Sequence, residues 1–102
     1  MAEIKITNAN FANEVLASDK PVLLDFWAAW CGPCAMLGPV LSEFAAAHPE
    51  IKVGKVNVDE EAELAMTHRV MSIPSLFVYK NGRIVNQTVG FQDMKRLEAL
   101  VK

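Results

Sequence analysis

The segment that most constrains the fold of this chain reads Val-Leu-Leu-Asp-Phe-Trp and runs from residue 22 to residue 27, directly after Pro21. Nearly continuous apolar runs of this length are typical of strands that are buried on both faces. Such a strand needs a layer of helices on each side, so we expect it to be the central strand of a three-layer α/β/α domain. With 102 residues, 52% of them hydrophobic, the chain is long enough to form one such domain over residues 1–102.

Four more segments have the composition of strands. Residues 3–6 form a short candidate, and residues 51–58 are rich in β-branched side chains, which favour strands. Residues 76–80 and 83–89 flank Asn81-Gly82, a dipeptide preferred in tight hairpins because both positions take a positive φ. We therefore expect two successive βαβ units, followed by a hairpin that adds antiparallel strands at one edge of the sheet.

Apolar side chains at helical spacing predict four helices, near residues 8–16, 33–48, 60–69 and 94–101. Thr7 or Asn8 is the expected cap of the first helix, whose apolar stripe is either Phe11 with Val15 or Ala12 with Leu16. In the second helix, Pro33 suits the first turn, Pro39 predicts a kink, and His48-Pro49 ends the helix. Asp59-Glu60-Glu61 is expected to cap the third helix and to supply negative charge at its start.

The balance of charges excludes several classes of partner. Ten basic and twelve acidic residues give a net charge of -2, which provides no broad attraction to nucleic acid or to an anionic membrane surface. The amino terminus has no continuous apolar stretch of the length that a signal peptide needs. The longest uncharged run, residues 26–42, is shorter than ~20 residues and contains both Gly and Pro. We expect a soluble, cytoplasmic monomer.

The two cysteines of the chain stand at the junction between the central strand and the second helix, in Cys31-Gly32-Pro33-Cys34. Unpaired N–H groups and the positive end of the helix dipole stabilise an anion at a helix amino terminus. Cys31, which we expect to be the less covered sulfur, should therefore ionise more easily than a free cysteine. In a reducing compartment, two such cysteines are more often catalytic or metal-binding than structural.

This placement predicts thiol-disulfide exchange. The Cys31 thiolate would attack a substrate disulfide and form a mixed disulfide, which Cys34 would resolve from within the same helical turn. Because Cys34 is held close to Cys31, the second step is fast. The enzyme is left oxidised, and the substrate leaves as a dithiol.

A metal site is the main alternative role for the cysteine pair. The two sulfurs would supply half of a tetrahedral zinc site, but His48 and His68, the only histidines, lie twenty residues apart and lack the usual ligand spacing. An iron-sulfur cluster would need four thiolates and therefore two chains. We favour no metal, and we expect both histidines at the surface.

Asp25 interrupts the apolar central strand, where an unpaired charge is costly or stays protonated. Lys55 shares a strand face with Ile51 and Val53, and adjacent strands could bring it within reach of Asp25. One interpretation is a buried ion pair. The other is catalytic: Asp25 accepts the proton of Cys34, directly or through water, and Lys55 tunes its basicity. The sequence leaves these two open.

Several short motifs together resemble one family. They are Asp25-Phe26-Trp27-Ala28, Trp30-Cys31-Gly32-Pro33-Cys34, Ile73-Pro74, Lys80-Asn81-Gly82 and Val89-Gly90. On these motifs the chain closely resembles the thioredoxin family over nearly its whole length. The resemblance implies a mixed sheet of five strands with four helices, a reversible Cys31–Cys34 disulfide and a cis Ile73–Pro74 bond facing the sulfurs.

The resemblance also implies a substrate groove formed by Trp30, Ile73, Pro74 and Gly90, in which an extended client segment pairs with backbone beside Ile73. Of the two tryptophans, we expect Trp27 to fill the core and Trp30 to form a partial lid over the attacking sulfur.

The expected activity is that of a protein-disulfide reductase that carries electrons. A cation at position 33 would favour the reduced thiolate and make the disulfide more oxidising, and Pro33 supplies none, so a reductant is favoured over an oxidase or isomerase. No dinucleotide-binding glycine motif is present, so no bound cofactor is expected and electrons must come from a partner. By resemblance that partner is a thioredoxin reductase, linked to NADPH or to ferredoxin, and the clients are disulfide-containing proteins. A non-catalytic binding module of the same fold is the alternative.

Four positions depart from the usual family pattern: Ala35, where a basic residue commonly follows the second cysteine, Met71 and Ser75 beside Ile73-Pro74, and Phe91 after Gly90. These departures predict a less basic and more apolar rim around the active site. Neutral drift of the surface would explain these four residues without giving them a functional role. The sharper hypothesis is that an exposed apolar rim of Met71, Ile73 and Phe91 alters the choice of partner.

Overall fold

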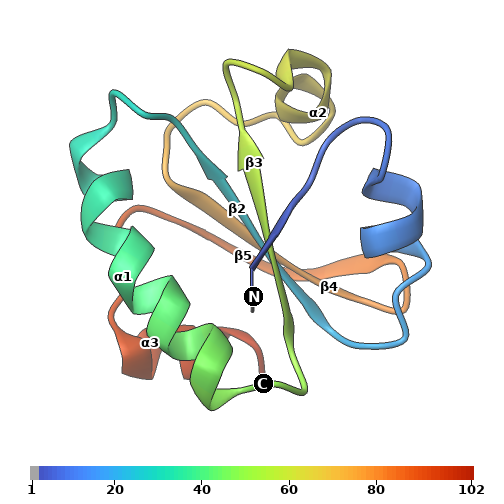
Figure 1. Ribbon diagram of the computed structural model, residues 1–102, viewed down its shortest axis with the longest axis vertical. Helices are drawn as coiled ribbons and strands as arrows, with labels where there is room; N and C mark the ends of the chain where they lie inside the picture. Colours follow the sequence, from blue (N-terminus) through green and yellow to red (C-terminus); the bar gives the residue numbers. More distant parts are fainter. Residues whose placement is uncertain (1–2) are drawn as a thin grey trace.

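Five strands form one mixed sheet in the order β1-β3-β2-β4-β5 in a computed structural model of the chain, which describes residues 3–102 (Figure 1). The strands are β1 (Glu3–Lys5), β2 (Val22–Trp27), β3 (Lys52–Asn57), β4 (Ser75–Lys80) and β5 (Arg83–Val89). β2 is the central strand, as its apolar sequence predicts. It pairs in parallel with β3 and antiparallel with β4. β1 pairs in parallel with β3 at one edge, and β5 pairs antiparallel with β4 at the other.

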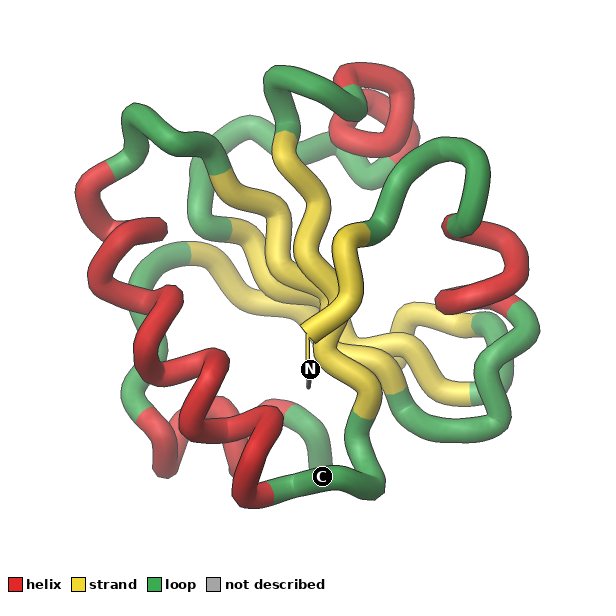
Figure 2. Tube along the Cα trace, in the orientation of Figure 1, coloured by secondary structure: helices red, strands yellow, loops and turns green. Residues whose placement is uncertain are grey.

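The part of the chain that the structure describes contains four helices: a short π-helix (Ala12–Leu16), α1 (Gly32–Ala47), α2 (Ala62–Thr67) and α3 (Met94–Leu100). α1 and α3 cover one face of the sheet, and the π-helix and α2 cover the other (Figures 1 and 2). The predicted α/β/α architecture is therefore confirmed. Within residues 3–102, none of these helices combines the length and apolar character that crossing a lipid bilayer requires.

Alternation along β2 explains why both faces of the sheet need a helical layer. Leu23 points into the core beneath α1 and α3, whereas Leu24 and Phe26 point into the core beneath the other two helices. All three side chains are fully buried. The same alternation directs Asp25 toward the layer of α1, where the cysteines lie.

The hairpin between β4 and β5 forms as predicted. Asn81 and Gly82 have φ values of 54° and 77°, so both residues of the turn take the left-handed conformation. The turn joins the strands at the paired positions Lys80 and Arg83.

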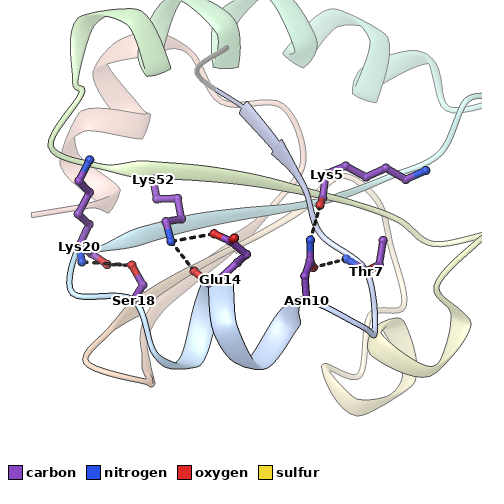
Figure 3. A network of polar contacts seen from close by, with 7 residues as sticks. All are labelled: Lys5, Thr7, Asn10, Glu14, Ser18, Lys20 and Lys52. Carbon is purple, nitrogen blue, oxygen red and sulfur yellow. Dashed lines mark hydrogen bonds and ion pairs between the residues drawn. The ribbon is translucent and has the colours of Figure 1, made fainter.

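The first helix differs from the prediction. It covers only Ala12–Leu16, and its capping residue makes no side-chain hydrogen bond. Neither Thr7 nor Asn8 caps it; instead, the Thr7 N–H donates to Asn10 Oδ1 over 2.7 Å, and Asn10 Nδ2 donates to the Lys5 carbonyl over 2.9 Å (Figure 3). A turn that is closed by an asparagine side chain thus links β1 to the helix.

The π-helix is held to the sheet by apolar packing and by hydrogen bonds from Lys52. Val15 is buried and Leu16 is exposed, so the stripe of Phe11 and Val15 is the one that faces the core. Lys52, at the start of β3, donates through Nζ to both the carbonyl and the carboxylate of Glu14, over 2.9 and 3.1 Å (Figure 3).

The predicted cap of α2 is also wrong. The residue before α2, Glu61, makes no side-chain capping bond. The side chain of Asn57 instead binds backbone earlier in the loop. Its Oδ1 accepts hydrogen bonds from the N–H groups of Asp59 and Glu60, over 2.9 and 3.3 Å.

His68 is not the surface residue that the sequence suggested. It is half-buried among the rings of Phe11, Phe26, Phe77 and Tyr79. Its Nδ1 lies 2.9 Å from the Leu64 carbonyl and its Nε2 lies 2.6 Å from the Tyr79 hydroxyl, and burial lowers the pKa of the imidazole. Hydrogen bonds to Glu98 and Glu50, in contrast, raise the pKa of His48.

Gly54 is the position in β3 where a side chain has no room. A Cβ atom there would lie 2.7 Å from Ile6 Cγ1 and 3.2 Å from Leu24 Cδ1, and both of these side chains are fully buried. At Gly38 in α1, by contrast, a Cβ atom would meet nothing within 4 Å.

We expect Gly54→Ala to lower the free energy of unfolding by about 1–3 kcal/mol, because overpacking displaces neighbouring side chains. The matched control, Gly38→Ala, should raise it by about 0.5–1 kcal/mol, because alanine favours the helix. Urea unfolding followed by circular dichroism measures both changes. Equal effects of the two substitutions would contradict the packing assigned to β3.

Candidate active site

Cys31 and Cys34 form a disulfide at the start of α1, with their Cα atoms 5.3 Å apart. Cys31 is the N-cap residue of the helix, and Gly32 and Pro33 form the first turn, a position where proline is favoured because it has no N–H to leave unpaired. The Cys34 N–H points back and lies 3.2 Å from Cys31 Sγ. The Cys31 sulfur thus replaces the side-chain oxygen that normally caps a helix.

This arrangement supplies the electrostatics that the sequence predicts for a reactive thiolate. In the reduced protein, the Cys34 N–H and the positive end of the α1 dipole would both stabilise negative charge on Cys31 Sγ. Exposure does not distinguish the cysteines, contrary to our expectation that Cys31 would be the less covered. The two residues are 6% and 7% exposed, and both pack against Ala28.

The Ile73–Pro74 peptide bond lies opposite the sulfurs and is cis, as the family resemblance implies. Cys31 Sγ is 3.7 Å from the Ile73 carbonyl oxygen. The Gly90 N–H donates to the Pro74 carbonyl over 2.8 Å, and Gly90 has a φ of 96°, a conformation that favours glycine. Three segments that are far apart in the sequence therefore meet around the disulfide.

The two tryptophans of the motif differ in environment. Trp30 is 71% exposed, and its Nε1 donates to Asp59 Oδ2 over 2.9 Å, a contact that the sequence did not reveal. Trp27 is partly buried against the cysteines, and Lys55 Nζ lies 5.0 Å from the centre of its ring.

A small apolar cavity of about 190 Å³ lies beside Trp30. Its remaining lining residues are Val58, Ala65, Val70, Met71, Ser72 and Ile73. Met71 is 94% exposed, and Ala35 and Phe91 are also exposed. Met71 and Phe91 of the predicted apolar rim are therefore exposed, whereas Ile73 is partly buried against the cysteines.

Asp25 lies in the middle of β2 and is only 2% exposed. Its Oδ1 is fully buried and has no hydrogen-bond partner among the described residues. Burial raises the pKa of Asp25 from 3.8 to about 7, the charge of Lys55 lowers it, and the charge of Glu3 raises it. A carboxyl group with this pKa can take up or release a proton near neutral pH.

Asp25 and Lys55 occupy paired positions on β2 and β3, so the strands do bring them together. The buried ion pair considered from the sequence does not form, however. Lys55 Nζ pairs with Glu3 Oε1 at 4.0 Å, while Glu3 Oε2 accepts a hydrogen bond from Ser42 Oγ over 2.7 Å. Glu3 was missed because only the pairing of β1 with β3 places it near Lys55.

Metal-binding groups do not assemble around the cysteines. Among residues 3–102, no three His, Cys, Asp or Glu side chains come together in a group that could hold a metal ion. His48 contacts Glu50 and Glu98 through its two ring nitrogens, and His68 lies within the aromatic cluster.

Comparison with known proteins connects this site to a family. The family model described as Thioredoxin matches residues 2–102. A thioredoxin of Alicyclobacillus acidocaldarius is 52% identical over 99 residues, which cover 96% of this chain and 93% of the relative. A thioredoxin of Mycobacterium tuberculosis is 50% identical over 90 residues, covering 87% and 78% of the two chains. Thioredoxin 1 of a Nostoc species is 48% identical over 90 residues, covering 87% and 84%.

The match extends over the described strands and helices and includes the Cys31–Cys34 disulfide. Relatives that match most of the chain are named thioredoxins. The chain is a thiol-disulfide oxidoreductase and belongs to the thioredoxin family.

Proposed function

We propose that the protein reduces disulfide bonds in client proteins through two sequential attacks by Cys31 and Cys34. The Cys31 thiolate attacks one client sulfur and releases the other as a thiolate. The Cys34 thiolate then attacks Cys31 Sγ, which forms the Cys31–Cys34 disulfide and releases the second client sulfur. Two electrons pass to the client, which takes up two protons to become a dithiol. The contact between the Cys34 N–H and Cys31 Sγ at the start of α1 is the observation that supports the first attack.

Asp25 is proposed as the proton acceptor that makes Cys34 a nucleophile. The carboxylate lies on the face of β2 that α1 covers, and its pKa of about 7 allows it to accept a proton at neutral pH. Its unpartnered Oδ1 is consistent with proton transfer through a water molecule. Lys55, in register with Asp25 on β3, tunes the basicity of the carboxylate.

The client is proposed to bind across Trp30, Ile73, Pro74 and Gly90, with an extended segment beside the Ile73 backbone. The cavity next to Trp30 would accept an apolar client side chain. Cys31 Sγ lies next to the Ile73 carbonyl, so a segment held there would have its disulfide close to the attacking sulfur.

The electrons are proposed to come from a thioredoxin reductase, since the redox group of this chain is the disulfide itself. We propose that residues 1–102 act as one monomeric domain in the cytoplasm, as an electron carrier in cell redox homeostasis. The proposal includes no bound cofactor and no nucleic-acid or membrane partner.

The cysteine roles predict different failures for two variants. In an assay of insulin reduction with dithiothreitol as electron source, Cys31→Ser and Cys34→Ser should both lose catalytic turnover. Only Cys34→Ser should accumulate a mixed disulfide with a client, because only it retains the attacking thiol. Mass spectrometry under non-reducing conditions detects this adduct. No acceleration of insulin reduction by the wild-type protein would instead indicate a non-catalytic binding module.

The role of Asp25 predicts a change in the pH profile of one step. In the wild-type protein, resolution of the mixed disulfide should accelerate as the pH rises through about 7, where Asp25 loses its proton. Asp25→Asn should leave the attack by Cys31 unchanged and slow resolution by about 10²-fold or more, without this inflection. Rapid-quench kinetics with a preformed mixed disulfide separates the two steps. An unchanged rate of resolution would contradict the role of Asp25.

The same substitution has a matching effect on stability. The folded-state pKa of Asp25 lies above its ordinary value of 3.8, so the folded protein binds the proton more tightly, and the free energy of unfolding falls as pH rises through about 7. Relative to wild type, Asp25→Asn should therefore gain stability between pH 4 and pH 8, by up to about 4 kcal/mol. Urea unfolding at several pH values measures this gain, and a difference that is constant with pH would contradict the raised pKa.

The exposed rim predicts an effect on partner choice. Ala35→Lys together with Phe91→Ala should change the ratio of kcat/KM values between two clients, or between two reductases, by about fivefold. Ile84→Ala, on the exposed strand β5, is the matched control because it removes exposed apolar surface elsewhere. Equal ratios for all variants across a panel of partners would leave neutral drift as the explanation.

A further inference from the structure

Five charged groups from three strands and the following loop surround one point on the α1 face of the sheet. Glu3 and Lys5 come from β1, Asp25 from β2, Lys55 from β3, and Glu60 from the loop after β3. Lys5 pairs with Glu60 at 3.3 Å, and both of these side chains are more than half exposed. Within this group, Glu3 is the anion paired with Lys55.

Glu3 is held from two sides. Its Oε2 accepts a hydrogen bond from Ser42 Oγ of α1 over 2.7 Å, and its Oε1 lies 4.0 Å from Lys55 Nζ. The side chain is 20% exposed, so the carboxylate is partly shielded from water. Charges in such positions interact more strongly than charges at a free surface.

Lys55 lies within a cleft that also leaves room beside its ammonium group. Its ammonium group lies over the ring of Trp27 and beside an open cleft of about 300 Å³, lined by Glu3, Ile4, Lys5, Trp27, Lys55, Asn57 and Glu60. Its pairing register also places it next to Asp25. A flexible lysine side chain in this cleft would turn toward Asp25 unless another anion held it.

We propose that Glu3 is a positioning residue for the resolution step, which holds Lys55 toward β1 and thereby leaves the Asp25 carboxylate unpaired and able to accept a proton. The inference rests on the proposed role of Asp25 as proton acceptor for Cys34. Glu3 forms no hydrogen bond with the sulfurs or with Asp25. It therefore acts on Asp25 through the position of Lys55 and through its own negative charge.

The two effects of Glu3 act in the same direction. Lys55 lowers the pKa of Asp25 and Glu3 raises it. Removal of the Glu3 charge would take away the raising effect and would free Lys55 to approach Asp25, so both changes would lower the pKa of Asp25. A base with a lower pKa accepts the proton of a thiol less readily, so resolution would become slower at high pH and its inflection would move to lower pH.

Glu3→Gln tests the inference, because glutamine keeps the length of the side chain and can still accept the Ser42 hydrogen bond. We expect the Asp25 titration midpoint of the reduced protein, followed by carboxyl ¹³C NMR, to fall by roughly half a pH unit or more. The inflection in the rate of mixed-disulfide resolution should fall by the same amount. Glu60→Gln is the matched control, because it makes the same change of charge in the same cleft but removes the partner of Lys5.

A double-mutant cycle separates the two effects of Glu3. In a Lys55→Met background, Glu3→Gln should shift the Asp25 midpoint by less than it does in the wild type, because no ammonium group remains to be positioned. Circular dichroism of each variant checks that the fold is kept. If Glu3→Gln is poorly stable, Ser42→Ala gives a second test, because it removes the hydrogen bond that holds Glu3 and should also lower the Asp25 midpoint.

Two results would overturn the inference. An Asp25 midpoint that is the same in Glu3→Gln and wild type, or that moves equally in Glu60→Gln, would remove the specific role of Glu3. A midpoint that falls in Glu3→Gln while the resolution profile stays unchanged would overturn the role of Asp25 as base, and with it the kinetic role of Glu3. The Asp25 midpoint thus tests the inference about Glu3, and the resolution profile tests the proposed role of Asp25, so the two failures are distinguished.

Discussion

Burial of β2 between two helical layers is the constraint on which the rest of this structure depends. Leu23 on one face and Leu24 and Phe26 on the other require cover from α1 and from α2 with the π-helix. The same burial removes water from Asp25, which raises its pKa into the neutral range. The strand that organises the core therefore also gives Asp25 the pKa that its proposed role as a base requires. Burial of this carboxyl group lowers the stability of the fold.

The active site joins segments that no local pattern connects. The start of α1 supplies the cysteine pair and the Cys34 N–H that points at Cys31 Sγ, the loop before β4 supplies the Ile73 carbonyl, and the end of β5 leads into Gly90. The contact between the Cys34 N–H and Cys31 Sγ depends only on a helix that begins at Gly32. The positions of Ile73 and Gly90 depend on the order of the strands in the sheet. A reactive thiol can thus arise from local structure, but a place for a client beside it requires the whole fold.

Features fixed by neighbouring residues could be predicted from the sequence, and features fixed by distant ones could not. The Asn81-Gly82 turn, the limits of α1 and the central position of β2 follow from local conformation and burial, and the structure confirms each. The bond between Trp30 and Asp59 and the pairing of Lys55 with Glu3 rest on contacts between side chains of separate elements. Lys55 is an example of what the sequence could not predict. Its strand face was predicted, but both Asp25 and Glu3 lie within reach of its side chain. The register of β1 decides which of these acids it pairs with.

The Cys31–Cys34 bond closes a loop of only four residues. The entropy that a cross-link removes from the unfolded chain grows with loop length, and for so short a loop it corresponds to about 2 kcal/mol, less than half of what a loop of about 100 residues would give. Opening the bond therefore costs the fold less than half of the stability that opening a cross-link over such a long loop would cost. A change in the redox state of the protein alters the bonding of only two sulfurs, at the amino-terminal end of α1. The scaffold that presents these sulfurs to the next partner stays folded through the cycle.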